Sequence, residues 1–270
     1  MYEEPYRWVE AVGNRRQYLD EQFKQGSPVV GLAYDSGILL LTVSKGTPKL
    51  YEIYDRLALG GMGHPADLEK LRFSLLEMAH VEGFNRSPSD VTGGRMVKYG
   101  VAPVIKQAFE EVFKAPFIIK IMLAELGNKA EKDAFLVINY DGTFEEGRQC
   151  AVLAANRLVE QEMVAYLRRQ MAETLSLEQA VGTALRTWAL GDSLQQKAAQ
   201  EGTEEGGEGV GNSALPDTSA IDAHLRSRIA EKSIECAVLD RGQLGSSKYR
   251  SMTTEELGRL LPKDLSGSKT

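Results

Sequence analysis

The chain has 270 residues, of which 43% are hydrophobic and 26% are charged, and its formal net charge is −6. This is enough for one large domain or two small ones with a sizeable core, and the composition is that of an ordinary globular protein. The acidic balance gives no reason to expect nucleic acid or a membrane as a partner; the longest apolar run, 117–126, is about half a membrane span.

The first half of the chain alternates between helical and strand patterns. Residues 7–25 carry apolar side chains at helical spacing, which predicts a helix. Two short apolar runs, 29–34 and 38–43, are separated by Asp-Ser-Gly, and this pattern predicts a β-hairpin. The elements expected next are a strand pair over 49–63, a helix over 64–83, and a second helix over 87–113 that Pro103 should kink.

The second half repeats this alternation. Strands are expected over 117–127, 134–146, 150–155 and 233–239, with a strand-like stretch over 247–252. Helices are expected over 156–172, over 176–190 and from Thr253 or Thr254 onward. The helix at 176 opens with Ser-x-x-Gln, a capping-box pattern.

One internal segment, Gln195–Ala220, is rich in glycine and glutamate and has almost no large apolar residues. It cannot bury enough surface to offset its ordering entropy, so we predict a flexible loop there. The tail at 263–270 is expected to fray. A single domain is therefore predicted over residues 1–262.

The predicted order is helix, strands, two helices, strands, two helices, strands, helix. Paired helices between groups of antiparallel strands favour two sheets packed face to face with helices outside them. The predicted fold class is α+β, as a four-layer αββα sandwich of two antiparallel sheets flanked by helices.

Metal and redox chemistry have no support in the sequence. There are three histidines and no Cys-x-x-Cys motif, so neither a metal site nor a cofactor is predicted. The two cysteines, Cys150 and Cys236, lie in apolar segments, as expected of buried thiols in a reducing cytoplasm. The N-terminus has no apolar h-region, so a signal peptide is not expected.

Several local strings occur in a characteristic order: SPVVGLAYDSGILLL at 27–41, KLYEIYDRLALGGMG at 49–63, EGFNRSPSDVTGGRM at 82–96, YDGTFEE at 140–146 and ECAVLDRGQ at 235–243. Together they resemble the proteasome family of N-terminal-nucleophile hydrolases, and most closely the α-type subunits of bacterial 20S proteasomes. The resemblance runs from about residue 5 to residue 262. It departs from the family in the long Glu/Gly-rich segment and in the absence of the Tyr-Asp-Arg motif of archaeal and eukaryotic α-subunits.

The resemblance implies that this chain has no catalytic residue. In catalytic β-type subunits a threonine is exposed by processing, and its free amine helps to accept the proton of its hydroxyl. The position of that nucleophile falls on Ser27, that of the supporting aspartate on Val43, and that of the lysine on Lys49. Ser27 is followed by Pro28 and preceded by a predicted helix, so its nitrogen should remain an amide, and Val43 cannot hold a proton.

For Lys49 the resemblance implies a different role. The lysine at this place in α-type subunits lines a pocket between neighbouring subunits, where the terminal carboxylate of an activator such as an AAA+ ATPase docks. An ammonium group in a partly enclosed pocket is a good partner for a carboxylate. The alternative is an ordinary solvated lysine at the start of a strand.

The resemblance also implies an assembly. Seven copies of the chain would form an outer ring on rings of β-type subunits, and the complex would be a threonine endopeptidase that receives unfolded proteins in the cytoplasm. A gate at the ring axis would be formed by the N-terminal residues Met1, Tyr2, Glu3, Glu4, Pro5 and Tyr6. Two alternatives remain: a stand-alone ring-forming homologue, and an active hydrolase in which processing exposes Ser27.

Overall fold

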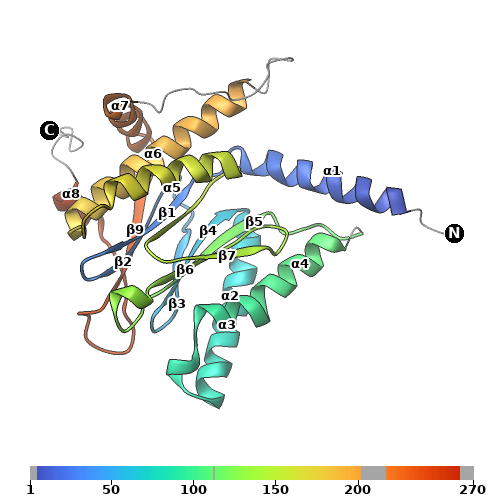
Figure 1. Ribbon diagram of the computed structural model, residues 1–270, viewed down its shortest axis with the longest axis horizontal. Coiled ribbons are helices and arrows are strands. Elements are labelled where there is room, and N and C mark those ends of the chain that lie inside the picture. The colour runs from blue at the N-terminus through green and yellow to red at the C-terminus, as the bar shows by residue number, and fades with distance from the viewer. Residues whose placement is uncertain (1–4, 112, 202–216, 262–270) are drawn as a thin grey trace.

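The computed structural model describes residues 5–111, 113–201 and 217–261. Two sheets lie face to face, with helices on both outer sides, so the predicted α+β four-layer αββα sandwich is confirmed (Figure 1). The pattern of short apolar strands separated by helix pairs produces this arrangement, because each sheet buries one face on the other sheet and one on helices.

The two sheets each contain five antiparallel strands among the described residues. The first has the order β10-β9-β2-β1-β8 and the second β3-β4-β5-β6-β7. The strands of the first sheet are β1 (Val29–Tyr34), β2 (Gly37–Ser44), β8 (Cys150–Leu153), β9 (Ser233–Asp240) and β10 (Tyr249–Ser251). Those of the second are β3 (Leu50–Tyr54), β4 (Leu57–Gly63), β5 (Ile119–Glu125), β6 (Ala134–Ile138) and β7 (Phe144–Gly147).

Helices cover the sheets on both outer faces. Over the first sheet lie α5 (Arg157–Gln170), α6 (Leu177–Glu201), α7 (Thr218–Ile229) and α8 (Thr254–Leu260). Over the second lie α2 (Pro65–Asn85), α3 (Gly93–Met96), the π-helical segment η2 (Val97–Val101) and α4 (Ala102–Glu110). The short 3₁₀ segments η1 (Pro88–Asp90) and η3 (Ala130–Lys132) complete the described elements. The helix expected over 87–113 is thus divided before Pro103, which lies in the first turn of α4.

The first helix, α1 (Pro5–Phe23), extends away from the body of the molecule (Figure 1). Its C-terminal part belongs to the core between the sheets, where Leu19 and Phe23 are 0% exposed. Arg15 attaches the helix to the opposite layer by donating hydrogen bonds to the carbonyl oxygens of Ala108 (2.9 Å) and Phe109 (3.0 Å). The N-terminal residues Trp8 and Val9 are exposed.

The predicted loop Gln195–Ala220 is wrong at both ends. Residues 195–201 are the last turns of α6, and residues 218–220 begin α7, which was not expected. Residues 202–216 lie outside the described residues. The run Gln-Gln-Lys-Ala-Ala-Gln-Glu is made of good helix formers, so propensity alone could have extended α6 to Glu201.

The unexpected helix α7 is held on α6 by charge. The Nε2 atom of His224 and the Nε atom of Arg228 each lie 2.8 Å from Oδ2 of Asp192, a carboxylate that is 5% exposed. Arg186 and Asp222 form a second pair at 2.9 Å. These contacts position the chain just before it enters β9.

Candidate functional site

The hydroxyl of Ser27 is fully engaged in the structure. Ser27 stands between α1 and β1 and is 8% exposed. Its Oγ donates a hydrogen bond to the carbonyl oxygen of Val43 at 2.5 Å and accepts one from Nε1 of Trp188 at 3.0 Å. The hydroxyl of Thr42 lies 3.4 Å away. None of these partners is a base, so nothing at hydrogen-bond distance would take the hydroxyl proton.

The nitrogen of Ser27 belongs to a continuous, packed chain. The preceding residue, Gly26, accepts a hydrogen bond through its carbonyl oxygen from Nε2 of Gln195 at 2.8 Å. Leu19 and Phe23, farther back, are core residues. Exposing the Ser27 amine would require removal of side chains from the core between the sheets.

Val43, at the position expected for an aspartate, is a core residue. It is 0% exposed and lies opposite Ile234 in the β2–β9 pair. Its side chain packs in the cluster between the first sheet and α5–α7. An aspartate here would be a buried charge in an apolar layer, so the position serves packing.

Lys49 lies directly before β3, and its backbone is anchored by Glu235 of β9. Its backbone N–H donates to both carboxylate oxygens of Glu235 at 3.0 Å, and the next N–H, of Leu50, donates to one of them at 2.8 Å. A carboxylate that receives these bonds fixes where β3 starts relative to β9. Glu235 therefore also fixes the position of the Lys49 backbone, from which the lysine side chain extends.

The ammonium of Lys49 is in an unusual environment. Burial lowers the pKa of Lys49 to about 8; the positive charge of Lys232 adds to this, and the carboxylate of Glu235 opposes it. Among the described residues, no hydrogen bond or ion pair within 4 Å involves this ammonium. A partly buried cation that is attracted by Glu235 but forms no close ion pair is suited to bind a carboxylate from outside the chain.

The predicted gate residues are only partly described. Pro5 and Tyr6 lie in the first turn of α1, so the helix begins two residues earlier than expected. Met1, Tyr2, Glu3 and Glu4 lie outside the described residues.

Three polar residues that the sequence did not single out belong to this region. Gln195 is 4% exposed; besides Gly26 it contacts Ala155, whose N–H donates to Oε1 of Gln195 at 2.8 Å. Lys120 is 4% exposed and donates to the carbonyl oxygen of Ala154 at 2.8 Å and to Glu160 at 3.0 Å. The position of Lys120 inside an apolar predicted strand could have indicated a buried, paired lysine. No comparable feature of the sequence pointed to Gln195 or Trp188.

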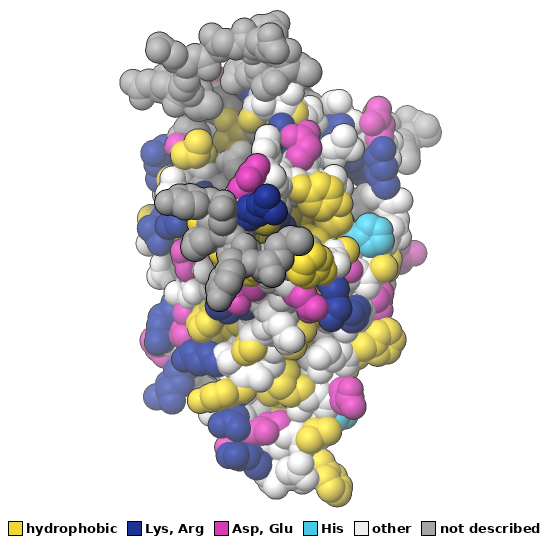
Figure 2. All heavy atoms as spheres, turned by 90° about the vertical axis from the view of Figure 1, so that its right-hand side faces the viewer, with side chains coloured by type: hydrophobic (Ala, Val, Ile, Leu, Met, Phe, Trp, Pro, Cys, Tyr) yellow, Lys and Arg dark blue, Asp and Glu magenta, His cyan; other side chains and the backbone are white. Residues whose placement is uncertain are grey.

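Several of the exposed apolar side chains lie on the α2–α4 layer and on α1. On the α2–α4 layer, the aromatic residues Phe73 (60% exposed), Phe84 (91%) and Tyr99 (76%) point to the outside. On α1, Trp8 is 48% and Val9 is 69% exposed. Figure 2, seen from the side on which α1 emerges, shows hydrophobic side chains among charged ones over this face. Exposed aromatic residues in such number mark protein–protein contacts.

The described residues hold neither a metal-binding cluster nor a membrane-spanning helix. No group of three or more His, Cys, Asp or Glu side chains in the described part of the chain is arranged to hold a metal ion. Within the same residues, every helix is too short or too polar to cross a bilayer.

The chain is similar in sequence to proteasome subunits. A family model described as proteasome subunit matches residues 23–201. The chain is 29% identical to "Proteasome subunit alpha" of Saccharopolyspora erythraea over 240 residues, which cover 88% of this chain and 79% of that protein. It is 26% identical to the protein of the same name from Thermobifida fusca over 250 residues, covering 92% and 86% of the two chains.

Proposed function

The chain belongs to the proteasome subunit family, and we propose that it is a non-catalytic α-type subunit that forms the outer ring of a bacterial 20S proteasome. The ring gates the entry of unfolded proteins and docks an activator such as an AAA+ ATPase. Assembly with β-type subunits and with further copies of the chain follows from the family. The complex, and not this chain, is a threonine endopeptidase of the cytoplasm.

The environment of Ser27 carries this proposal. A nucleophile of the family's kind needs a free amine or another base beside it. Ser27 instead has an amide nitrogen in a continuous chain, and Trp188 and Val43 engage its hydroxyl. The relatives named as α subunits agree with this arrangement. The fold of the hydrolase is therefore retained for assembly.

The two apolar surfaces support an assembly with two kinds of neighbour. In Figure 1, α1 emerges on the level of α5 and α6, while the α2–α4 layer lies on the other side of the sandwich. We assign the exposed part of α1 to a contact with the next copy in a ring of seven. We assign the α2–α4 layer, with Phe73, Phe84 and Tyr99, to the β-type subunit.

The partly buried ammonium of Lys49 supports activator docking. Lys49 stands at the start of an edge strand, and in the described chain its ammonium is attracted by Glu235 but has no anion within 4 Å, so it can pair with an anion from outside. The terminal carboxylate of an activator, inserted between two copies, would supply that anion. Residues 1–6 of the seven copies would narrow the entrance at the ring axis.

Co-expression with a β-type subunit tests the proposal. Native mass spectrometry and electron microscopy of the purified complex are expected to show sevenfold outer rings of the full-length chain. Peptidase activity is expected in the complex and not in the isolated chain. Loss of residues 1–26 with peptidase activity of the chain alone would support an active hydrolase instead. Stable rings that never bind the β-type subunit would support a stand-alone homologue.

A further inference from the structure

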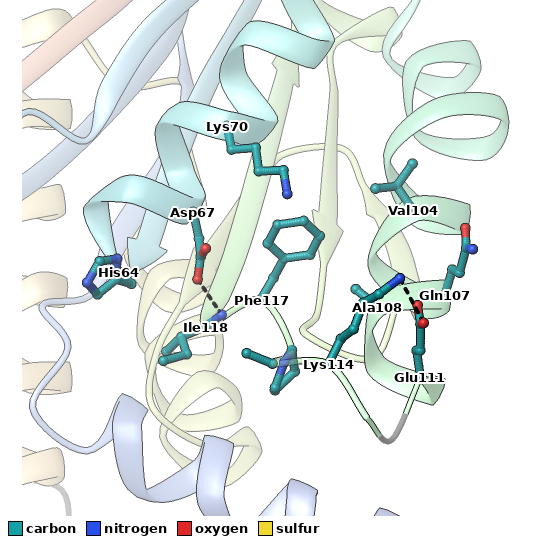
Figure 3. A pocket seen from close by; sticks show the side chains of 12 residues that line it. His64, Asp67, Lys70, Val104, Gln107, Ala108, Glu111, Lys114, Phe117 and Ile118 are labelled. Atoms are coloured by element: carbon teal, nitrogen blue, oxygen red, sulfur yellow. Dashed lines mark hydrogen bonds and ion pairs between the residues drawn. The ribbon is translucent and has the colours of Figure 1, made fainter.

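A cavity of about 460 Å³ opens between α2 and α4, on the layer that carries the exposed aromatic residues. Figure 3 shows Lys70 of α2 pointing into it above the ring of Phe117, with Gln107 and Val104 of α4 on the opposite wall. The ammonium of Lys70 lies 4.9 Å from the centre of that ring. The cavity thus has an aromatic floor with a cation above it.

The acidic groups of this cavity are already engaged. Asp67 accepts a hydrogen bond from the backbone N–H of Ile118 at 2.9 Å, and Glu111 pairs with Lys114 at 2.8 Å (Figure 3). The Nδ1 atom of His64 accepts a hydrogen bond from the N–H of Ala66 at 3.2 Å. Among the described residues, the exposed Lys70 has no carboxylate within ion-pair distance, and its ammonium lies over the face of Phe117.

Exposed apolar side chains lie in and beside the lining segments of the cavity. Val104, which lines it, is 43% exposed; Phe113, between the lining residues Glu111 and Lys114 in the sequence, is 90% exposed; and Phe73, which follows Lys70 by one turn of α2, is 60% exposed. A recess with an aromatic floor, and with exposed apolar side chains in and beside its lining, is the form that anchor sites of protein interfaces take. A small polar ligand would leave these side chains in water, so they favour a protein as the occupant.

A protein that covers these side chains would also remove water from Lys70. An ammonium that loses its water without gaining an anion is strongly unfavourable, and the ring of Phe117 compensates only part of that loss. The partner must therefore bring a negative charge to this point. A carboxylate of the partner would supply this charge. Its side chain must have an apolar aliphatic part, because it passes the apolar side chains of Val104 and Phe117.

We propose that this cavity binds a side-chain carboxylate, from a glutamate or aspartate of the β-type subunit, which pairs with Lys70 above Phe117. The inference rests on the proposed function, because the β-type subunit is the partner assigned to the α2–α4 layer. It adds a specific anchor point and a charge requirement to that contact. Lys70 would then determine which partner surface the layer accepts, since a neutral partner residue would leave the ammonium unpaired once the contact covers it, and a basic one would repel it.

The test compares three full-length variants in binding to the β-type subunit. Lys70→Met keeps the apolar stem over Phe117 and removes the charge, and Lys70→Glu reverses the charge. Lys197→Glu makes the same charge change at an exposed lysine of α6, on the opposite layer. Lys70→Met is expected to weaken binding about tenfold and Lys70→Glu by more, while Lys197→Glu binds as the wild type does.

A rescue experiment identifies the partner residue. Single Glu→Lys and Asp→Lys changes in the β-type subunit are expected to include one that restores binding to Lys70→Glu and weakens binding to the wild type. Wild-type complexes that form while all Lys70 variants bind equally well would overturn the proposal and leave the proposed function intact. If the wild type itself binds no β-type subunit, the proposed function fails, and this inference fails with it.

Discussion

The carboxylate of Glu235 accepts the backbone N–H of Lys49 through both of its oxygens, at 3.0 Å each. It thereby anchors the main chain of the lysine, while the ammonium keeps no ion pair among the described residues. Burial and Lys232 hold the pKa of Lys49 at about 8. The charge that we assign to activator docking is therefore sensitive to pH in a range where most lysines are not.

Binding of an activator's C-terminal peptide is expected to weaken as the pH rises from 7 to 9. The ammonium is charged below its pKa of about 8 and neutral above it, and only the charged form attracts a carboxylate. Isothermal titration at constant ionic strength measures this. Lys49→Arg is the matched control, because arginine stays charged across this range. Affinity of the wild type that does not change with pH would contradict the role of the Lys49 charge.

Removal of the side chain is a second, independent test of the same contact. Lys49→Ala is expected to lose a charge-assisted hydrogen bond of about 1.5–3 kcal/mol per site, which is about tenfold or more in the affinity of the peptide. Several sites act together in a ring, so a whole activator would lose more. Ring formation should be unchanged. Equal peptide affinity of variant and wild type would show that activators dock elsewhere.

Ser27→Ala is expected to change stability and not catalysis. The substitution leaves the indole N–H of Trp188 buried without its acceptor, which costs about 1–3 kcal/mol. Urea denaturation of the isolated chain measures this cost. Trp188→Phe removes the same hydrogen bond, so the two changes should be less than additive in the double variant. A large drop in peptidase activity of an intact α/β complex carrying Ser27→Ala would argue for a catalytic Ser27.

Deletion of residues 1–5 is expected to open the entrance of the assembled particle. Hydrolysis of small peptides should rise, because the segment assigned to the ring axis is gone while the β-type active sites are the same. The rest of α1 remains attached through Arg15 and the core residue Leu19. Rates for a tripeptide and for an unfolded protein are compared before and after deletion. Unchanged rates for both substrates would show that these residues are not a gate.

Asp192→Asn is expected to loosen α7 from α6. The carboxylate is 5% exposed, and Arg228 and His224 contact it at 2.8 Å, so removing its charge leaves the partly buried guanidinium of Arg228 without its counter-ion. Losing the charged partner of such a half-buried pair costs about 1–3 kcal/mol in the free energy of unfolding. Glu173→Gln, at an exposed position, serves as the control. Equal urea midpoints for Asp192→Asn and Glu173→Gln would contradict the role of Asp192 in holding α7 on α6.

The pH dependence of that difference has a definite sign. Burial by itself would raise the pKa of Asp192, but hydrogen bonds from His224 and Arg228, with the charge of Lys232, hold it below its ordinary value. A depressed carboxyl pKa contributes stability that is present above the unfolded pKa and is lost as the pH falls through the folded pKa. The stability difference between wild type and Asp192→Asn should therefore be full at pH 7 and shrink in acid.

The sequence by itself determined the layers of this protein. Short continuous apolar runs, such as 29–34 and 38–43, can bury both faces only between another sheet and a layer of helices, and Asp-Ser-Gly between them makes the hairpin that pairs them. It also determined the absence of an acid at Val43, because no fold can make a valine hold a proton. Local chemistry fixed the start of α8, where Thr253 and Glu256 form a capping box.

Only the tertiary structure decided the roles of the polar residues. Glycine and glutamate in 195–220 predicted a loop, yet Gln195 is buried because Gly26 and Ala155, distant in sequence, supply its hydrogen-bond partners. Lys49 has a pKa of about 8 because folding buries its ammonium and brings the positive charge of Lys232 near it from the turn before β9, while Glu235 of β9 opposes the shift. The periodicity of apolar residues in the sequence indicates which face of a helix or strand is apolar. Hydrogen bonds and charge pairs between side chains depend on which helices and strands lie side by side, and only the folded chain determines that.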